Sequence, residues 1–585
     1  MRTRRQELAE AKAAHNHPTY STMSFVMGCG VQGPGSGAHV TDGDGRDLLA
    51  LFDQYGNQSF GYSHERILAA VAEQLASGRL NSTKILFEEE QIRLTARLAE
   101  LTGGRLPYAY LANGGGESID NALKLARAAT GRSTFVSALD CFHGKTFAAL
   151  SAANRPEHAA LYRPFLERFR QVPFDDLAAL DRAVDDDTAA VLLEPVQAEG
   201  GVIVPDPDYL AGVRRICTER GALLILDEMQ TAFGRCGPFF AFDRFGVTPD
   251  LVCVGKAFGG GVVPLSAVLG TEAVWASLRA LPSTFGSSLG GNPLCARVGL
   301  AAIEIATEES FGRTVAAHAE TLGDRLPALV ARFPRLLAAH RGIGMMHGLE
   351  FHDEMLGGMV LARLLRHGVT STYSLYHSRV LRVQPPMVIT PADLAYGLDV
   401  LERVLAEVDA RQDDPAGRPA VPCSPVVRTA VLPVPRAELR ELLHRRPRLL
   451  DPFAFDPGGA TDDGLDPGGA TDDGLDPGGA TDDGLEPEFG GTLGHDRVVW
   501  ADRVARTPDG VRASAVPDWL WRRLERTVRV RAVDGDDRRS VVEVRVDWDT
   551  GSGPYEPLLA GQLGPFVSDR LDALLARLAD KMART

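Results

Sequence analysis

The chain lacks the cysteine pattern of a disulfide-stabilised or zinc-binding protein. Its seven cysteines are scattered over 585 residues, and no two of them form a Cys-x-x-Cys pair. An odd number of well-separated cysteines indicates neither a disulfide framework nor a structural zinc site. The sequence therefore indicates no metal site.

Long apolar runs and an excess of positive charge are also missing. No run approaches membrane-spanning length, and no apolar stretch follows the charged N-terminus Met1-Arg2-Thr3-Arg4-Arg5. The net charge of −15 disfavours a nucleic-acid partner. With 44% hydrophobic and 24% charged residues, the composition is typical of a globular protein of several domains. We expect a cytoplasmic protein without a membrane partner.

Lysine is scarce too, and one of the six lysines has a distinctive context. Lys256 ends the segment Pro249-Asp250-Leu251-Val252-Cys253-Val254-Gly255-Lys256, and three consecutive glycines follow shortly after it. This pattern predicts a buried strand that delivers an amine into a glycine-rich loop. Burial lowers the pKa of a lysine, so that its neutral amine can react with a carbonyl group. Without this context, a lysine after a strand is more often a solvent-facing charge.

A second buried strand, expected at residues 222–226, ends in Asp227-Glu228. An aspartate can keep the ring nitrogen of a pyridine-type cofactor protonated, which lets the ring accept electrons from a substrate carbon. The acidic pair could instead cap a helix or bind a metal, but no His or Cys cluster lies beside it. Asp227 and Lys256 are therefore interpreted as the acid and the amine that such a cofactor requires.

A third segment has the pattern of a phosphate-binding turn. A strand is expected at residues 108–112, the glycine turn Asn113-Gly114-Gly115-Gly116 follows, and apolar residues then recur at helical spacing over residues 119–126. Backbone N–H groups at the start of that helix would face an anion.

These segments, together with others in the same order, resemble the class III pyridoxal-phosphate-dependent aminotransferases of fold type I over about residues 20 to 410. The matching stretches are Thr41-Asp42-Gly43-Asp44-Gly45-Arg46, Asn113 to Glu117, Phe142-His143-Gly144-Lys145-Thr146, Glu194-Pro195-Val196-Gln197-Ala198-Glu199-Gly200-Gly201, Asp227-Glu228-Met229-Gln230-Thr231, Lys256, Gly290-Gly291-Asn292-Pro293, and Leu381-Arg382-Val383-Gln384-Pro385-Pro386. No single stretch is specific, so the resemblance depends on their order and spacing.

The resemblance implies an α/β protein with a large mixed-sheet domain and a small α/β domain. We expect an N-terminal segment over residues 1–60, a large cofactor-binding domain over 61–304, a small domain over 305–412 and a linker over 413–424. The implied cofactor is pyridoxal 5'-phosphate, and the implied active unit is a homodimer.

Four residues take cofactor roles by the resemblance. Lys256 would bind the cofactor covalently and carry the proton, and Asp227 would pair with the pyridine nitrogen. Phe142 would stack on the ring, and Gln230 would approach the ring hydroxyl. Considered without the resemblance, Phe142 would simply be a core residue. His143 remains unassigned.

The phosphate would be held by Gly115 and Gly116. Gly116 stands where the family usually has a small hydroxyl residue, so one side-chain contact to the phosphate is missing and backbone donors must contribute more. In the family, a threonine from the partner subunit also reaches the phosphate. Ser288 takes that position by its register with the following Gly-Gly-Asn, whereas Thr284 resembles it by local sequence, and we favour Ser288.

Substrate binding would involve Arg382 and Glu199. Arg382 resembles the family's carboxylate-binding arginine, and Glu199 the glutamate that pairs with it when no carboxylate is bound. A buried guanidinium is costly to leave unpaired, so this pair could act as a switch between two substrates. Lys145 stands where ornithine-type members commonly have an arginine, and this favours a diamine or another terminal amine, although a lysine could still bind a carboxylate as a point charge.

Residues 425–585 are expected to form a separate α+β domain. The expected elements are a strand at residues 426–434, a helix at 436–444, a strand at 497–504, a hairpin of 527–533 and 540–547, and an amphipathic helix with Leu571, Leu574, Leu575, Leu578 and Met582 on one face. This order is weakly similar to the START-like, polyketide-cyclase helix-grip fold, which would enclose an apolar cavity for a ligand. A packing or interaction domain is the alternative.

An acidic repeat interrupts this C-terminal domain. The unit Asp456-Pro457-Gly458-Gly459-Ala460-Thr461-Asp462-Asp463-Gly464-Leu465 occurs three times before it decays. We expect a disordered insert over residues 456–490, because the repeat lacks the apolar surface needed to offset chain ordering. Its aspartate spacing matches neither an EF-hand loop nor the nine-residue calcium repeat.

The predicted activity is a ping-pong transamination from a terminal amine, diamine or ω-amino acid to a 2-oxo acid such as 2-oxoglutarate, and the appended domain suggests a specialised biosynthetic pathway. Two alternatives remain open. A mutase or decarboxylase of the same fold could use the same lysine and aspartate. The protein could also be a ligand carrier with a silent aminotransferase part, but the retention of Asp227, Lys256 and Arg382 argues against that.

Overall fold

The computed structural model describes residues 4–16, 30–43, 45–82, 85–153, 155, 161–280, 286–410, 426–432, 486–487, 503–507, 510–515, 523–533 and 536–549. The chain divides into two units, Gln32–Asp413 and the segments on either side of it.

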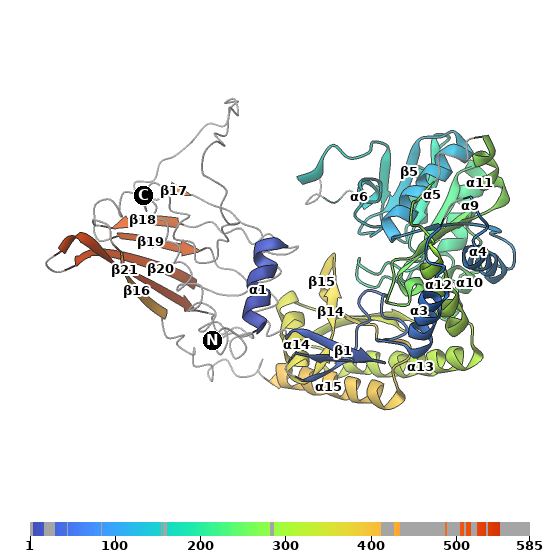
Figure 1. Cartoon of the computed structure of the whole chain (residues 1–585). Coiled ribbons are helices and arrows are strands. Elements are labelled where there is room, and N and C mark those ends of the chain that lie inside the picture. The colour runs from blue at the N-terminus through green and yellow to red at the C-terminus, as the bar shows by residue number, and fades with distance from the viewer. Residues whose placement is uncertain are drawn as a thin grey trace, which may run out of the picture. The chain divides into compact units, whose positions relative to one another are not determined.

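The larger of the two sheets that follow one another in Gln32–Asp413 is mixed and has seven strands (Figure 1). Its strands, in spatial order, are β4 (Tyr108–Ala112), β10 (Ser266–Gly270), β9 (Leu251–Val254), β8 (Leu223–Asp227), β7 (Thr188–Leu193), β5 (Thr134–Ala138) and β6 (Phe169–Val172). Only β10 runs against its neighbours, so the other six strands have their carboxyl ends at the same edge of the sheet. The expected mixed-sheet α/β fold is confirmed.

Apolar side chains cover both faces of this sheet. In β8, Leu224 and Leu226 pack into one apolar cluster with α9 (Tyr209–Arg220), whereas Ile225 packs into another with α5 (Gly115–Thr130). Burial on both faces explains why these strands appear in the sequence as continuous apolar runs. The other helical elements in this part of the described chain are α3 (Glu65–Ser77), α4 (Glu89–Leu101), α6 (Phe147–Ala153), α8 (Leu177–Ala183), α10 (Ala241–Arg244), η1 (Lys256–Gly259), α11 (Glu272–Ala276), η2 (Ser277–Ala280) and α12 (Pro293–Ala306).

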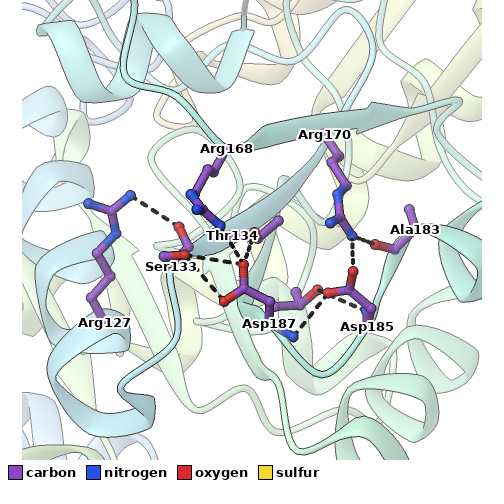
Figure 2. A network of polar contacts seen from close by, with 9 residues as sticks. Arg127, Ser133, Thr134, Arg168, Arg170, Ala183, Asp185 and Asp187 are labelled. Carbon is purple, nitrogen blue, oxygen red and sulfur yellow. Dashed lines mark hydrogen bonds and ion pairs between the residues drawn. The ribbon is translucent and has the colours of Figure 1, made fainter.

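A polar network connects the amino ends of three parallel strands (Figure 2). Asp187, just before β7, accepts hydrogen bonds from Thr134 Oγ1 at 2.7 Å and Arg168 Nη1 at 2.9 Å. Thr134 begins β5 and Arg168 precedes β6. Asp185 pairs with Arg170 of β6 at 2.6 Å. These contacts fix the strands at the edge opposite their carboxyl ends.

A smaller antiparallel sheet follows in the chain. Its order is β11 (Leu337–Ile343), β12 (Met346–Phe351), β15 (His377–Val383) and β14 (Thr372–Ser374). Helix α14 (Glu354–Arg366) packs against β15 and against α15 (Pro391–Ala410), and α13 (Glu309–Arg332) packs against β11. Figure 1 shows α13 and α15 beside these elements.

The N-terminal strands β1 (Gln32–Ser36), β2 (His39–Asp42) and β3 (Asp47–Ala50) form a sheet with β13 (Val369–Thr370). Strand β13 pairs in parallel with β3, and this joins the expected N-terminal segment to the expected small domain. Phe52 then forms a bridge with Gln384, directly after β15. The start of the chain therefore contributes to the neighbourhood of Arg382.

The second unit contains α1 (Arg4–His15) and a six-stranded antiparallel sheet. The sheet order is β16 (Val426–Leu432), β21 (Asp536–Asp549), β20 (Arg523–Val533), β19 (Gly510–Ala515), β18 (Arg503–Thr507) and β17 (Glu486–Pro487).

Several C-terminal expectations can be compared with this sheet. The expected hairpin corresponds to β20 and β21, which are longer than predicted and turn where Val533 lies opposite Asp536. Strand β19 was missed, because its small and polar residues lack a β-branched run. Glu486–Pro487 is paired with β18, although we expected it inside the disordered insert. The predicted helix at 436–444, residues 456–485 of the insert and the final amphipathic helix lie outside the described residues, and the helix-grip fold stays a prediction.

Among the helices that the structure describes, none has both the length and the apolar character required to span a membrane.

Candidate active site

The candidate site lies where the carboxyl ends of the parallel strands meet. Strand β8 ends at Asp227, β9 is followed by Gly255 and Lys256, and β4 leads into the glycine turn before α5. Strands β5 and β7 are followed by the segments that carry Phe142 and Glu194. Since these strands point the same way, residues far apart in the sequence converge at one edge.

Lys256 has an unusual backbone and a perturbed amine. Its φ is +51°, which is left-handed and costs about 1–2 kcal/mol for a residue with a side chain. A Cβ on the preceding Gly255 would come within 2.6 Å of Met229 Sδ, so a larger residue there would require the Met229 side chain to shift. The residue as a whole is half-buried, but burial around its amine lowers the pKa of Lys256, while the charges of Glu199 and Asp227 act in the opposite direction.

Asp227 is held by a buried histidine that the sequence left unassigned. One carboxylate oxygen accepts the N–H of Met229 at 3.0 Å, and the other lies 2.8 Å from His143 Nδ1. Burial opposes protonation of His143, but Cys141 and Asp227 raise its pKa well above the ordinary value. His143 Nε2 is buried and has no hydrogen-bond partner among the described residues. Its position next to Phe142 was the only hint in the sequence, because the pairing with β8 is tertiary.

The glycine turn precedes a helix, α5, as predicted. Gly114 is the N-cap, so Gly115 and Gly116 occupy the first turn, where backbone N–H groups lack intrahelical acceptors. Glu117 Oε2 accepts hydrogen bonds from the backbone N–H of Asn113 at 2.9 Å and from its side chain at 3.0 Å, which closes the turn. The turn thus combines unused donors with an open backbone suited to an anion.

The backbone of Phe142 is held by a buried carboxyl group. Its backbone N–H donates to Glu194 Oε1 at 3.0 Å, and its ring lies 5.9 Å from the ring of Tyr376. Burial raises the pKa of Glu194 to about 7, with His143 acting in the opposite direction. Glu194 belongs to one of the stretches that resemble the family, but the sequence alone gave no role for it.

Arg382 and Glu199 form a buried ion pair. Arg382 Nη1 donates to Glu199 Oε1 at 2.8 Å, and both side chains are almost fully buried. Arg382 Nη2 donates to Gln230 Oε1 at 2.8 Å and also to Gln384 Oε1. Burial works against ionisation of Glu199, but the charges of Arg382 and Lys256 hold its pKa below the ordinary value.

A further buried layer supports this pair, and the sequence gave no indication of it. Gln384 Nε2 donates to Asp53 Oδ1 at 3.0 Å, and Asp53 forms a fully buried ion pair with Arg235. Arg235 also donates to the backbone oxygens of Met345 and Pro385. Each of these contacts joins two residues that are more than a hundred positions apart, so no local pattern could have revealed them.

The structure does not bring every expected residue into this cluster. Lys145 is exposed. Ser288 is exposed in the loop before α12, whereas the neighbouring Ser287 Oγ accepts a hydrogen bond from Asn113 Nδ2 at 2.9 Å. Thr284 lies outside the described residues. Either Ser288, which we favour, or Thr284 was expected to contact the phosphate in the partner subunit, and this contact between two chains stays a prediction.

The chain is similar to known proteins in sequence. The family model for class-III aminotransferases matches residues 31–405. A putrescine aminotransferase from Pectobacterium atrosepticum is 37% identical over 384 residues, which cover 64% of this chain and 82% of that protein.

Solved structures share the fold. An ornithine aminotransferase from Toxoplasma gondii, with pyridoxal phosphate partly occupying its active site, is 29% identical, with a TM-score of 0.62 over 66% of this chain and 91% of that one. A transaminase from the marine bacterium Virgibacillus gives a TM-score of 0.65 at 24% identity and covers 69% of this chain and 100% of that one.

Proposed function

Because the chain belongs to the class-III aminotransferases, which are pyridoxal-phosphate-dependent transaminases, we propose that it transfers an amino group from a terminal amine, diamine or ω-amino acid to 2-oxoglutarate. The observation that carries this proposal is the buried Arg382–Glu199 pair, which Gln230 bridges through both ends of its amide and whose charges act on the amine of Lys256. A guanidinium with a removable counter-ion is suited to an enzyme that must accept a dicarboxylate in one half-reaction and an amine in the other.

The residues present fit the cofactor. The first turn of α5 offers unused N–H donors for a phosphate, and Asp227 and the amine of Lys256 stand at the ends of adjacent strands. We assign Gly115 and Gly116 to the phosphate and Phe142 to the ring face. When bound, pyridoxal phosphate supplies an aldehyde for covalent attachment and an electron sink for the substrate carbon.

At the ring, Asp227 would hold a proton on the pyridine nitrogen, and Gln230 would contact the ring hydroxyl. His143 Nδ1 contacts Asp227 Oδ2, and this contact fixes the orientation of the Asp227 carboxylate. A buried carboxylate supported by two hydrogen bonds is suited to stabilising positive charge at a fixed position.

Lys256 would move the proton. Burial lowers the pKa of Lys256, which increases the fraction of neutral amine available to react with a carbonyl and to accept a proton. Its Nζ would take the proton from the donor carbon and then deliver it to the cofactor carbon. One atom would therefore serve both proton transfers. A pKa closer to the working pH favours both directions of that transfer.

The amine donor is proposed from two observations. The chain is 37% identical to a protein named for its action on putrescine, a diamine. Lys145 is exposed, where ornithine-type members carry an arginine, so a donor carboxylate lacks a bidentate partner at this position. Both observations favour a diamine or another terminal amine that has no carboxylate for the enzyme to bind.

We also propose that the active unit is a homodimer. Ile85, Leu86 and Phe87 are 90%, 70% and 98% exposed in one segment just before α4, and large apolar side chains gathered in this way commonly mark an interface. A groove near this helix is lined by Gln91, Ile92, Ser287 and Ser288. Sedimentation of the wild type and of Phe87→Asp tests this proposal, because the variant should shift towards a monomer while a matched change at Leu75, exposed on α3, should not.

One experiment tests the proposed reaction. The purified protein is incubated with pyridoxal phosphate, reduced with borohydride and digested, and mass spectrometry should find the adduct on Lys256. Diamines, amino acids and ω-amino acids are then screened with 2-oxoglutarate, and glutamate is measured. Donor-dependent glutamate formation supports a transaminase, whereas turnover of a donor without an acceptor would point to a mutase or decarboxylase. Folded protein that forms no adduct would refute the proposal.

A further inference from the structure

The loop from Phe142 to Thr146 crosses the first turn of α5. Gly144 has a φ of +122°, and a Cβ placed on it would lie 2.9 Å from Gly116 Cα and 3.3 Å from Gly116 N. The loop therefore touches the backbone at the point where the helix presents its N–H groups. Only a glycine combines this conformation with so close an approach.

Thr146, two residues further on, fills the space that a side chain at position 116 would occupy. A Cβ built on Gly116 would lie 3.0 Å from Thr146 Cγ2 and 3.1 Å from Thr146 Oγ1. Thr146 Oγ1 donates to Asp120 Oδ1 at 2.8 Å and lies 3.4 Å from Gly116 O. The hydroxyl thus stands at the first turn of α5, and Thr146 is exposed, so a ligand can reach it.

We infer that the Thr146 hydroxyl binds the phosphate of pyridoxal phosphate and supplies the side-chain contact that Gly116 cannot make. This inference rests on the proposed function, which places the phosphate at the first turn of α5. A threonine and a glycine that fit together would then do what one hydroxyl residue at position 116 could do alone.

The hydroxyl has one proton to donate, so the phosphate must compete with Asp120. Burial raises the pKa of Asp120, so its charged form is disfavoured, whereas a phosphate carries more negative charge and is the stronger acceptor. Asp120 would not be left alone, because it also accepts the backbone N–H of Ala149 and lies near the charge of Lys124. The hydroxyl proton can therefore turn from Asp120 to the phosphate without leaving the half-buried Asp120 carboxylate unsupported.

This assignment gives one short loop contacts at both ends of the cofactor. Phe142, which the proposed function assigns to the ring face, is anchored through its backbone N–H, and His143 contacts the carboxylate assigned to the ring nitrogen. Thr146 would reach the phosphate at the other end. Five consecutive residues would then set the distance between the two ends.

The test compares pyridoxal phosphate with pyridoxal, which has the same ring and aldehyde but no phosphate. Thr146→Val keeps the shape and removes the hydroxyl, and Thr146→Ser keeps the hydroxyl. Dissociation constants are measured by fluorescence on full-length protein freed of cofactor. We expect the valine variant to bind pyridoxal phosphate about ten- to a hundredfold more weakly and pyridoxal within about twofold of the wild type, because a hydrogen bond to a charged group is lost. The serine variant should bind both like the wild type.

A reciprocal pair of substitutions separates phosphate binding from a purely structural role. Gly116→Ser alone should weaken binding, because its side chain meets Thr146, whereas Gly116→Ser combined with Thr146→Ala should recover most of the affinity for pyridoxal phosphate. Thr314→Val, which removes an exposed helix hydroxyl bonded to Ser310 O, is the matched control and should change neither constant.

Equal losses for both ligands, or an unchanged constant for pyridoxal phosphate in Thr146→Val, would overturn the inference. The proposed function would survive that outcome as long as the wild type still forms its adduct on Lys256. If Thr146→Val does not fold, the serine variant and the reciprocal pair decide the question.

Discussion

The Arg382–Glu199 pair leads to a prediction with two opposite effects in one variant. Glu199→Gln removes the charge that faces Arg382 at 2.8 Å and keeps the size of the side chain. Breaking a buried ion pair typically costs about 3–5 kcal/mol. Here Arg382 Nη2 keeps its two amide acceptors, Gln230 and Gln384. We therefore expect a smaller loss of unfolding free energy, about 1.5–3 kcal/mol, which is the value of one charge-assisted hydrogen bond.

The same change should strengthen binding of the acceptor. In the wild type, a substrate carboxylate must displace Glu199 from Arg382, and the variant has no anionic competitor. If the energy lost in the ligand-free protein reappears as affinity, the dissociation constant for 2-oxoglutarate falls about ten- to a hundredfold, at about 1.4 kcal/mol per factor of ten. The affinity for a diamine donor should not rise.

Two measurements test this prediction. Each half-reaction is followed separately through the cofactor absorbance, and urea unfolding is measured with and without glutarate, which is a dicarboxylate without a reactive carbonyl group. Glutarate should stabilise Glu199→Gln more than it stabilises the wild type. Asp250→Asn is the matched control, because it breaks the Arg214–Asp250 ion pair of 2.6 Å and should leave the affinity for 2-oxoglutarate unchanged.

The pH dependence has a defined sign. The pKa of Glu199 is held below its ordinary value of 4.5 in the folded protein, so its contribution to stability is present above pH 4.5 and is lost as the pH falls through the folded pKa. Glu199→Gln should lack this acid-sensitive component. An unchanged affinity for 2-oxoglutarate together with wild-type acid sensitivity would refute the switch.

Three further predictions concern other parts of the chain. Gly344→Ala should lower the free energy of unfolding by about 1–3 kcal/mol, because the φ of Gly344 is +61° and the added Cβ would lie 2.3 Å from Arg235 O. Gly323→Ala is the control: at this helix position the added Cβ meets nothing within 4 Å, so the free energy of unfolding should stay unchanged or rise by up to about 1 kcal/mol. Thermal unfolding distinguishes the two variants. Burial raises the pKa of Glu194 to about 7, so its contribution to stability is present below pH 4.5 and lost as the pH rises through about 7, and unfolding of Glu194→Gln across this range should depend less on pH. Truncation after residue 424 should preserve turnover of simple amines, and a dimeric truncated protein without activity would contradict the independence of the aminotransferase part from the C-terminal segment.

The residues that we assign to the cofactor could be proposed from the sequence because each belongs to a local pattern. An apolar run that ends in one lysine, another that ends in an aspartate, and a glycine turn before a helix can all be recognised within about ten residues of sequence. Their relation to one another came only from the family resemblance, since the spacing along the chain does not show which strands are neighbours. The structure supplies that relation by pairing β8 with β9 in parallel.

The supporting residues could not be predicted in the same way. His143 is 84 positions from Asp227, and Gln384 is 331 positions from Asp53, yet both pairs are buried and hydrogen-bonded. Nothing in the local pattern distinguishes a histidine that supports a carboxylate from one in a loop. The contact of Thr146 with Gly116 is equally invisible, because it depends on how closely one loop approaches the first turn of a helix.

The sequence by itself determined the chemical groups at the strand ends, the mixed α/β architecture through its family, and the position of the acidic repeat. Only the tertiary structure decided which buried polar groups share hydrogen bonds, which glycine is packed against which side chain, and how the N-terminal strands join the region of Arg382. The reason is physical. Secondary structure and turns follow from neighbours in the chain, whereas the pairing of buried charges depends on strand order and on crossings between distant segments.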